Sequence, residues 1–135
     1  MPDIRMILPI AVALLLGACS AMEKVKDKVS DLVQPGAAEQ KLSIGIKNYE
    51  DGNYSASLQS LNEAEKMGLS RKEDNVAVHK YKAFIYCITD RKNQCRHEFE
   101  DIFEYDPNFD LKPAEAGHPV WGPVFRSVKA SGFAK

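Results

Sequence analysis

Three cysteines and three histidines are the residues of this 135-residue chain with the widest choice of chemistry. A cysteine thiol can be acylated, can form a disulfide or can bind a metal ion, and a histidine can bind a metal ion or move a proton. Cys19 follows an apolar run near the N-terminus, whereas Cys87 and Cys95 lie in the second half of the chain. The surroundings of each residue decide which of these reactions is expected.

The apolar run before Cys19 has the length of a signal peptide core. Met6–Leu16 reads MILPIAVALLL, without a charged residue, and Arg5 precedes it. A membrane-spanning helix needs roughly 20 apolar residues, whereas the core of a signal peptide needs roughly 7–15. A buried core helix is the alternative interpretation.

The tetrad Leu16-Gly17-Ala18-Cys19 resembles a bacterial lipobox. The resemblance implies that residues 1–18 are a signal peptide, that cleavage occurs before Cys19, and that Cys19 carries a diacylglycerol and an acyl chain. Because several buried acyl chains anchor more firmly than one, the mature protein is expected at a membrane. Ser20 stands where an aspartate would resemble an inner-membrane retention signal, which favours the periplasmic face of the outer membrane. No cofactor other than this covalent lipid is expected.

Cys87 and Cys95 are the remaining cysteines, and the periplasm that the lipobox resemblance implies is a compartment where disulfides persist. They flank a predicted helical turn at residues 90–93, which can bring their Cα atoms within the roughly 4.4–6.8 Å that a bridge requires. We expect a disulfide; two buried free thiols are the alternative. The spacing matches neither a redox motif nor a haem-attachment motif.

The histidines, serines and acidic residues do not form a catalytic or metal-binding pattern. The histidines are scattered over two predicted helices and a loop without a zinc-ligand spacing: His79, His97 and His118. No Gly-x-Ser-x-Gly turn surrounds a serine. Five acidic residues alternate with apolar ones and are interpreted as a solvated helix face: Glu98, Glu100, Asp101, Glu104 and Asp106. We therefore expect no enzyme, no metal site and no small-molecule substrate.

Composition and net charge exclude further classes of function. Eighteen basic and nineteen acidic residues give a net charge of -1, which leaves no electrostatic case for a nucleic-acid partner. With 44% hydrophobic residues, the chain is expected to fold as one domain. Residues 19–37 are expected to be a lipidated tether with a short amphipathic helix over Met22–Gln34, which would rest on the headgroups, on the domain or on a partner.

Two segments of the remaining domain, residues 38–135, align with each other at helical-hairpin spacing. The repeats cover about 38–71 and 76–109, joined by a spacer at Lys72–Asn75. Small residues at matching positions allow close helix approach: Gly45 and Ser57 in the first repeat, Ala83 and Cys95 in the second. Asp90 stands where the first repeat has its turn glycine, Gly52. The spacing predicts an all-α, tetratricopeptide-like pair of antiparallel helical hairpins; an unrelated small helical bundle is the alternative.

The C-terminal part predicts a cap on this pair. Pro113–Gly117 reads as a helical turn, and apolar residues including Trp121 and Phe125 recur at helical spacing after it, within a cap at about 113–130. The capping role of Trp121 and Phe125 is favoured over a binding role, because a repeat array needs its last apolar face covered.

A tetratricopeptide pair binds partners through the face made by the first helix of each hairpin. The residues predicted to contact a partner are Leu42, Ile46, Tyr49, Lys80, Phe84 and Ile88. Such an apolar strip, if exposed, would be a protein-binding groove. The alternative is that the final helix or Met22–Val33 fills it.

The lipobox, the repeat pair and the terminal runs Asp106–Leu111 and Gly117–Phe125 together resemble small tetratricopeptide lipoproteins of the TssQ type, found beside type VI secretion genes. The resemblance implies an accessory role in the cell envelope and no catalytic residues. We therefore expect an outer-membrane-anchored periplasmic adaptor that binds a protein partner, with the secretion apparatus as the implied assembly. A structural lipoprotein that fills its own groove and contacts peptidoglycan or membrane is the alternative.

Overall fold

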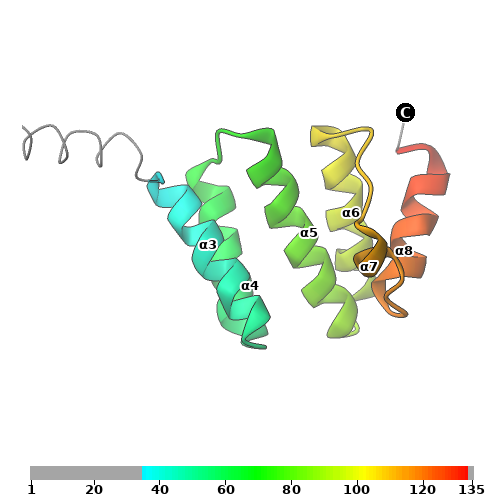
Figure 1. The fold of residues 1–135 in the computed structure, drawn as a ribbon, viewed down its shortest axis with the longest axis horizontal. Coiled ribbons are helices and arrows are strands. Elements are labelled where there is room, and N and C mark those ends of the chain that lie inside the picture. Colours follow the sequence, from blue (N-terminus) through cyan, green and yellow to red (C-terminus); the bar gives the residue numbers. More distant parts are fainter. Residues whose placement is uncertain (1–34, 134–135) are drawn as a thin grey trace, which may run out of the picture. The chain divides into compact units, whose positions relative to one another are not determined.

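The computed structural model describes residues 35–133, and all regular structure in this range is helical. α3 (Ala37–Glu50) and α4 (Tyr54–Met67) form one antiparallel hairpin, and α5 (Lys72–Ile88) and α6 (Lys92–Tyr105) form the next (Figure 1). The short helix α7 (Pro113–Ala116) precedes the C-terminal helix α8 (Trp121–Val128) and its π-helical extension η2 (Lys129–Phe133). The prediction of an all-α pair of antiparallel hairpins with a C-terminal capping helix is confirmed.

Both hairpins turn at a residue with positive φ. Gly52 follows α3 with φ 77°, and Asp90 follows α5 with φ 59°. Glycine adopts this left-handed conformation without steric cost, and aspartate is one of the few other residues that tolerate it. Asp90 therefore supplies the turn geometry that Gly52 supplies in the first hairpin.

Small residues let the helices of each hairpin approach closely. The Ser57 hydroxyl donates to the Gly45 carbonyl over 2.6 Å, and a Cβ added to Gly45 would lie 2.7 Å from the Leu61 side chain. Ala83 and Cys95 occupy the matching positions of the second hairpin and are fully buried. This is the contact that the repeat alignment predicts.

The predicted spacer at Lys72–Asn75 is wrong, because α5 begins at Lys72 and these residues form its first turn. Two acidic residues, Glu73 and Asp74, lie in that turn, where the positive end of the helix dipole stabilises them. Arg71 donates two hydrogen bonds of 2.8 Å to the Asp74 carboxylate. These local interactions extend the helix into the expected linker.

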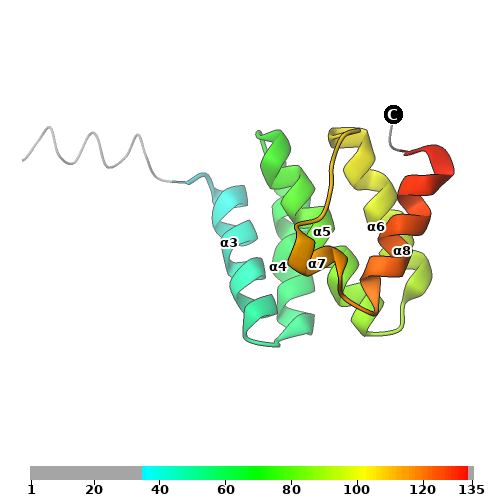
Figure 2. The ribbon, with the colours of Figure 1, turned by 45° about the vertical axis from the view of Figure 1, so that its right-hand side comes forward.

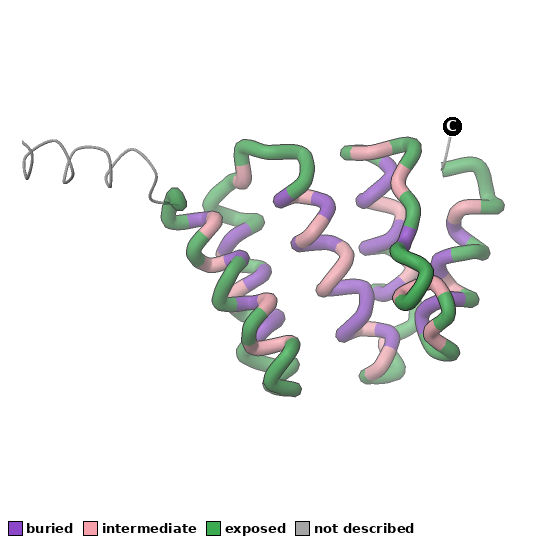
Figure 3. The backbone as a smooth tube through the Cα atoms, in the orientation of Figure 1, coloured by how far each residue is buried: buried purple, intermediate pink, exposed green. Residues whose placement is uncertain are grey.

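The core has two apolar clusters, one between the hairpins and one between the second hairpin and α8. The first contains Leu58, Leu61, Val78 and Ile85, and the second contains Phe99, Phe103, Trp121, Phe125 and Val128. Figure 3 shows that the buried positions follow the inner faces of the helices, whereas the turns are exposed. α8 lies alongside α6 (Figure 2).

Candidate functional site

The six residues predicted to bind a partner do not form one exposed strip. Leu42 and Phe84 are buried, and Ile46, Tyr49, Lys80 and Ile88 are half-buried. The sequence left open whether the strip is exposed or is covered by the final helix or by Met22–Val33, a segment that lies outside the described residues. The structure places the C-terminal segment over its second-hairpin part and leaves a groove at its first-hairpin part.

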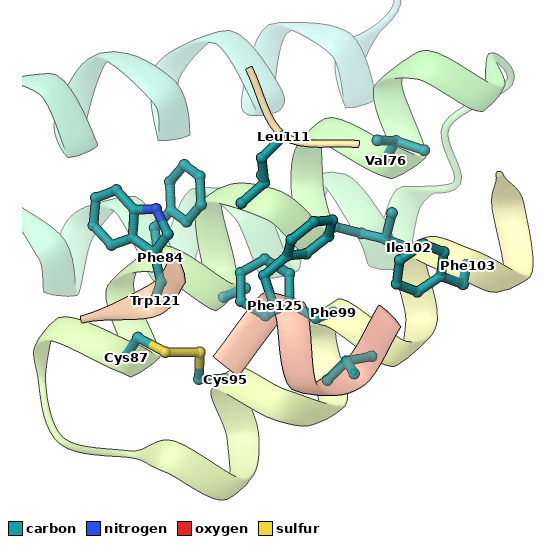
Figure 4. Packing of buried hydrophobic residues seen from close by; sticks show 12 residues of the cluster. Val76, Phe84, Cys87, Cys95, Phe99, Ile102, Phe103, Leu111, Trp121 and Phe125 are labelled. Atoms are coloured by element: carbon teal, nitrogen blue, oxygen red, sulfur yellow. A yellow bond between two sulfur atoms is a disulfide. The ribbon is translucent and has the colours of Figure 1, made fainter. Parts of the chain in front are cut away.

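Trp121 covers the second-hairpin part of the strip. Its ring stacks on Phe84 with the centroids 4.1 Å apart, and only 7% of Trp121 is exposed (Figure 4). The indole nitrogen donates to the Glu115 carbonyl over 2.8 Å. Lys80, predicted to contact a partner, donates to the Glu115 carboxylate over 2.7 Å. Both Phe84 and Lys80 therefore hold the C-terminal segment in place.

Phe125, four residues after Trp121 on α8, also packs on the second hairpin. Its ring contacts Phe99 edge-on at 5.2 Å and stacks on Phe103 at 5.8 Å. Trp121 and Phe125 both point into the core in Figure 4. Their packing is that of the predicted cap.

Among residues 35–133, a groove beside α3 is left uncovered. It has a volume of about 470 Å³, and Leu42 and Ile46 form its apolar part. Charged residues surround them on α3 and at the start of α5: Glu39, Lys47, Glu50, Arg71 and Asp74. An apolar floor inside a charged rim suits a protein segment that buries one or two apolar side chains and pairs its polar groups at the edge.

Aromatic residues connect this groove region to the covered part. The Tyr49 ring lies 5.0 Å from the Tyr81 ring and 6.2 Å from the Phe84 ring, measured between centroids. Burial, with the charge of Glu115 and the neighbouring tyrosines adding to it, raises the pKa of Tyr49 to about 12. Tyr49 is therefore a neutral packing residue at physiological pH.

A second groove, of about 330 Å³, lies between α6 and α8. It is lined by Lys92, Asn93, Arg96, Pro123, Val124 and Ser127. The Arg96 guanidinium spans it, donating to the hydroxyls of Ser127 and Ser131 over 3.2 and 3.3 Å. This groove is already bridged by the chain's own side chains.

A cluster of charged residues lies between α4, α5 and α6, and the sequence interpretation missed it. His79 and Glu98 are only 4% and 7% exposed, and His79 Nδ1 lies 2.7 Å from Glu98 Oε2. Lys82 Nζ lies 2.9 Å from Glu98 Oε1 and 2.7 Å from Glu65 Oε2. The interpretation of Glu98 as part of a solvated face is therefore wrong. His79 and Lys82, three residues apart on α5, face a matching pair, Glu98 and Asp101, on α6.

The pKa values in this cluster show competition between burial and charge. Burial by itself lowers the pKa of Lys82, but its hydrogen bonds and ion pairs with Glu65 and Glu98 outweigh that effect and raise the pKa. Burial raises the pKa of Asp101, and the nearby His79 and His97 oppose the shift. Lys82 is therefore held in its charged form by its carboxylate partners.

Cys87 and Cys95 form a disulfide in the structure, with their Cα atoms 5.1 Å apart. Both residues are buried, and the bridge joins the C-terminal end of α5 to the start of α6 (Figure 4). Whether the bridge forms in the cell stays a prediction. The Cα separation lies within the range of protein disulfides.

Ser57 and the two histidines outside the charged cluster each make local contacts. Ser57 serves the Gly45 contact, His97 is exposed on α6, and the His118 ring stacks on Trp121. Among residues 35–133, no helix combines the length and apolar character needed to cross a bilayer. The predicted signal peptide, Cys19 and the predicted helix at Met22–Gln34 lie outside the described residues.

No protein-family model matches the chain, and no curated protein or solved structure matches it either.

Proposed function

We propose that this chain is a lipid-anchored, non-catalytic adaptor at the periplasmic face of the outer membrane, which binds a protein partner of an envelope assembly. The observation that carries the proposal is the open groove with Leu42 and Ile46 at its floor. The lipobox resemblance of Leu16–Cys19 supports the anchor. The resemblance to TssQ-type lipoproteins supports an accessory role in type VI secretion.

The groove suits a protein segment better than a small molecule. It is open along α3, and its rim carries both signs of charge, so it offers a partner several separated polar contacts around one apolar centre. Protein interfaces have this organisation, with an apolar core inside a polar rim. A partner would insert an apolar side chain beside Ile46 and pair with the rim charges.

Two isoleucines of α3 provide a matched test of the groove. Ile46 lines it, whereas Ile44, 49% exposed, lies outside it on the same helix. Ile46→Glu should weaken partner capture at least 10-fold, since a charge at an interface centre removes a hot-spot contact. Ile44→Glu introduces the same charge in the same helix and should leave capture unchanged.

The assay is cross-linking and affinity capture of the lipidated protein from its native host, with partners identified by mass spectrometry. Unfolding by urea should be measured for both variants, so that a loss of binding is separated from a loss of folding. A protein that is captured by wild type and Ile44→Glu, and lost only with a folded Ile46→Glu, supports the adaptor. Equal capture by both variants contradicts it.

The anchor has its own test. Cys19→Ala should stop lipidation and leave an unprocessed precursor that retains residues 1–18. Normal processing of that variant contradicts the lipobox interpretation, whatever the groove binds.

A second candidate is a structural lipoprotein that contacts peptidoglycan or membrane. The observation that favours it is the Trp121 ring on Phe84, because it shows the chain filling part of its own predicted binding strip. Capture of peptidoglycan and abundant outer-membrane proteins alone, equally by both isoleucine variants, would favour this candidate.

A further inference from the structure

The charged cluster between α5 and α6 contains the donor atoms of a metal site. His79 of α5 and Glu98 and Asp101 of α6 each offer one donor atom, and these atoms lie within 4.8 Å of one another. We propose that these three residues bind a divalent transition-metal ion, with Zn²⁺ as the ion tested. This role is independent of the groove beside α3.

The distances between the donor atoms are close to those that a bound ion imposes. His79 Nδ1 lies 2.7 Å from Glu98 Oε2 and 3.7 Å from Asp101 Oδ2. Zinc bonds of about 2.0–2.2 Å in a tetrahedral arrangement separate neighbouring donors by about 3.4 Å. Because the Glu98 carboxylate accepts the His79–Glu98 hydrogen bond, His79 Nδ1 carries the shared proton, and insertion of the ion displaces that proton to Nε2 or to solvent. Insertion also needs shifts of about 1 Å, within the reach of the two carboxylate side chains.

The donor types select the class of ion. One imidazole nitrogen with carboxylate oxygens suits Zn²⁺ and its first-row neighbours, whereas Mg²⁺ and Ca²⁺ prefer ligand sets made only of oxygen. Three protein donors leave one position of a tetrahedral ion for water. The proposed site is therefore a three-ligand site with one open position.

The charges of the cluster favour a cation. Three carboxylates, Glu65, Glu98 and Asp101, lie around His79, and Lys82 supplies the ammonium group that pairs with two of them. With His79 neutral the five groups sum to minus two. A divalent ion at His79 Nδ1 brings this sum to zero in a partly buried setting, where unbalanced charge is costly.

Lys82 does not occupy the position of the ion. Its ammonium group contacts Glu98 Oε1, the oxygen that faces away from His79 in the pairing, and leaves Oε2 for the metal. A lysine on the second oxygen of a ligating carboxylate orients that carboxylate.

The surroundings of His79 hold its ring for binding through Nδ1. Its Nε2 lies 3.9 Å from Glu65 Oε1, so a shift of less than 1 Å would let this carboxylate accept the ring N–H, and the Tyr105 ring stacks on the imidazole with the centroids 5.5 Å apart. Metal-bound histidines commonly donate their second ring N–H to such a group. The Asp101 side chain is 26% exposed, which provides a route from solvent.

The test uses the mature chain from Cys19, in detergent and without an affinity tag, after removal of metal by a chelator. Zn²⁺ is titrated by calorimetry at pH 7.5, and the ring nitrogens of the histidines are followed by NMR. The variants are Asp101→Asn, which replaces the carboxylate donor with a neutral and much weaker amide oxygen at little cost in volume, and the control His97→Gln, which removes an exposed histidine of α6.

We expect one Zn²⁺ per chain, a shift of the His79 Nδ1 resonance on binding, at least 10-fold weaker binding by Asp101→Asn, and unchanged binding by His97→Gln. No saturable binding up to 100-fold excess Zn²⁺, or an unshifted His79 resonance in the wild type, overturns the proposal. Equal binding by Asp101→Asn and wild type, or a loss with His97→Gln, also overturns it.

Discussion

Truncating Trp121 should loosen the C-terminal segment from the second hairpin. The residue is almost wholly buried, stacks on Phe84 and donates to the Glu115 carbonyl. Trp121→Ala removes the ring, the stack and the hydrogen bond together. The helices of the hairpins should remain, because most of their core contacts do not involve this residue.

The expected loss of unfolding free energy in Trp121→Ala follows from these contacts. Truncation of a buried tryptophan to alanine costs about 3–5 kcal/mol, which includes about 0.5–1.5 kcal/mol for the aromatic pair. Trp121 begins α8, where the chain can relax into part of the space, so we expect the lower end, about 3 kcal/mol. For a domain of this size that corresponds to a Tm lower by about 12–24 °C. Trp121→Phe keeps a ring on Phe84 but leaves the Glu115 carbonyl without its donor, and should cost about 1–2 kcal/mol.

The assay is urea unfolding followed by circular dichroism at 222 nm, with Val120→Ala as the control. Val120 is the exposed neighbour of Trp121, and its truncation should change the unfolding free energy by less than about 0.5 kcal/mol. A loss below about 1 kcal/mol for Trp121→Ala would refute the reasoning, because it would mean that the ring does not cover Phe84 in solution.

Three further predictions concern the hairpins. Replacing Cys87 and Cys95 by alanine should lower the unfolding free energy by about 2–3 kcal/mol, because the unfolded chain is no longer restricted by the cross-link. If both thiols of the wild type can be alkylated without a reductant, the disulfide itself is contradicted. Gly45→Ala should destabilise by about 1 kcal/mol, since crowding against Leu61 costs about 1–3 kcal/mol and the gain in helix propensity returns about 1 kcal/mol. In a Leu61→Ala background, Gly45→Ala should leave the unfolding free energy unchanged or raise it. An equal loss of unfolding free energy in both backgrounds would show that crowding between the new Cβ and the Leu61 side chain is not the cause. The pKa of Tyr49 is 10.0 in the unfolded chain and about 12 in the folded protein, so the stability that this difference contributes is present below pH 10 and is lost as the pH rises toward 12. Wild type and Tyr49→Phe should therefore differ in the pH dependence of their unfolding free energy only above about pH 10. Parallel curves of unfolding free energy between pH 10 and 12 would contradict the raised pKa.

The helical hairpins could be predicted because their signals are local. Apolar residues at helical spacing define the buried face of each helix, and small residues such as Gly45 and Cys95 mark where two faces meet closely. The turn at Asp90 was also foreseeable, since its position matched Gly52 in the aligned repeat. The start of α5 was not, because a polar run at Lys72–Asn75 reads equally as a linker or as a first helical turn.

The charged cluster could not be predicted, because its members are polar and their burial depends on one another. Glu98 alternates with apolar residues in the way that an exposed acidic residue does. It is buried because His79 and Lys82, from the preceding helix, meet it across the α5–α6 contact. A sequence pattern on one helix contains no information about which polar groups of another helix will balance it.

By itself the sequence determined that the chain is helical, that it forms two hairpins, and that an apolar segment with Trp121 and Phe125 follows them, since all of these depend on spacing within a few turns. Only the tertiary structure decided which part of the predicted binding strip the C-terminal segment covers. Phe84 is covered and Ile46 lines a groove because the connection after α6 brings Trp121 back onto the second hairpin and not onto the first. That choice depends on the path of the chain in space and on the Lys80–Glu115 ion pair, contacts between residues far apart in the sequence that no local pattern specifies.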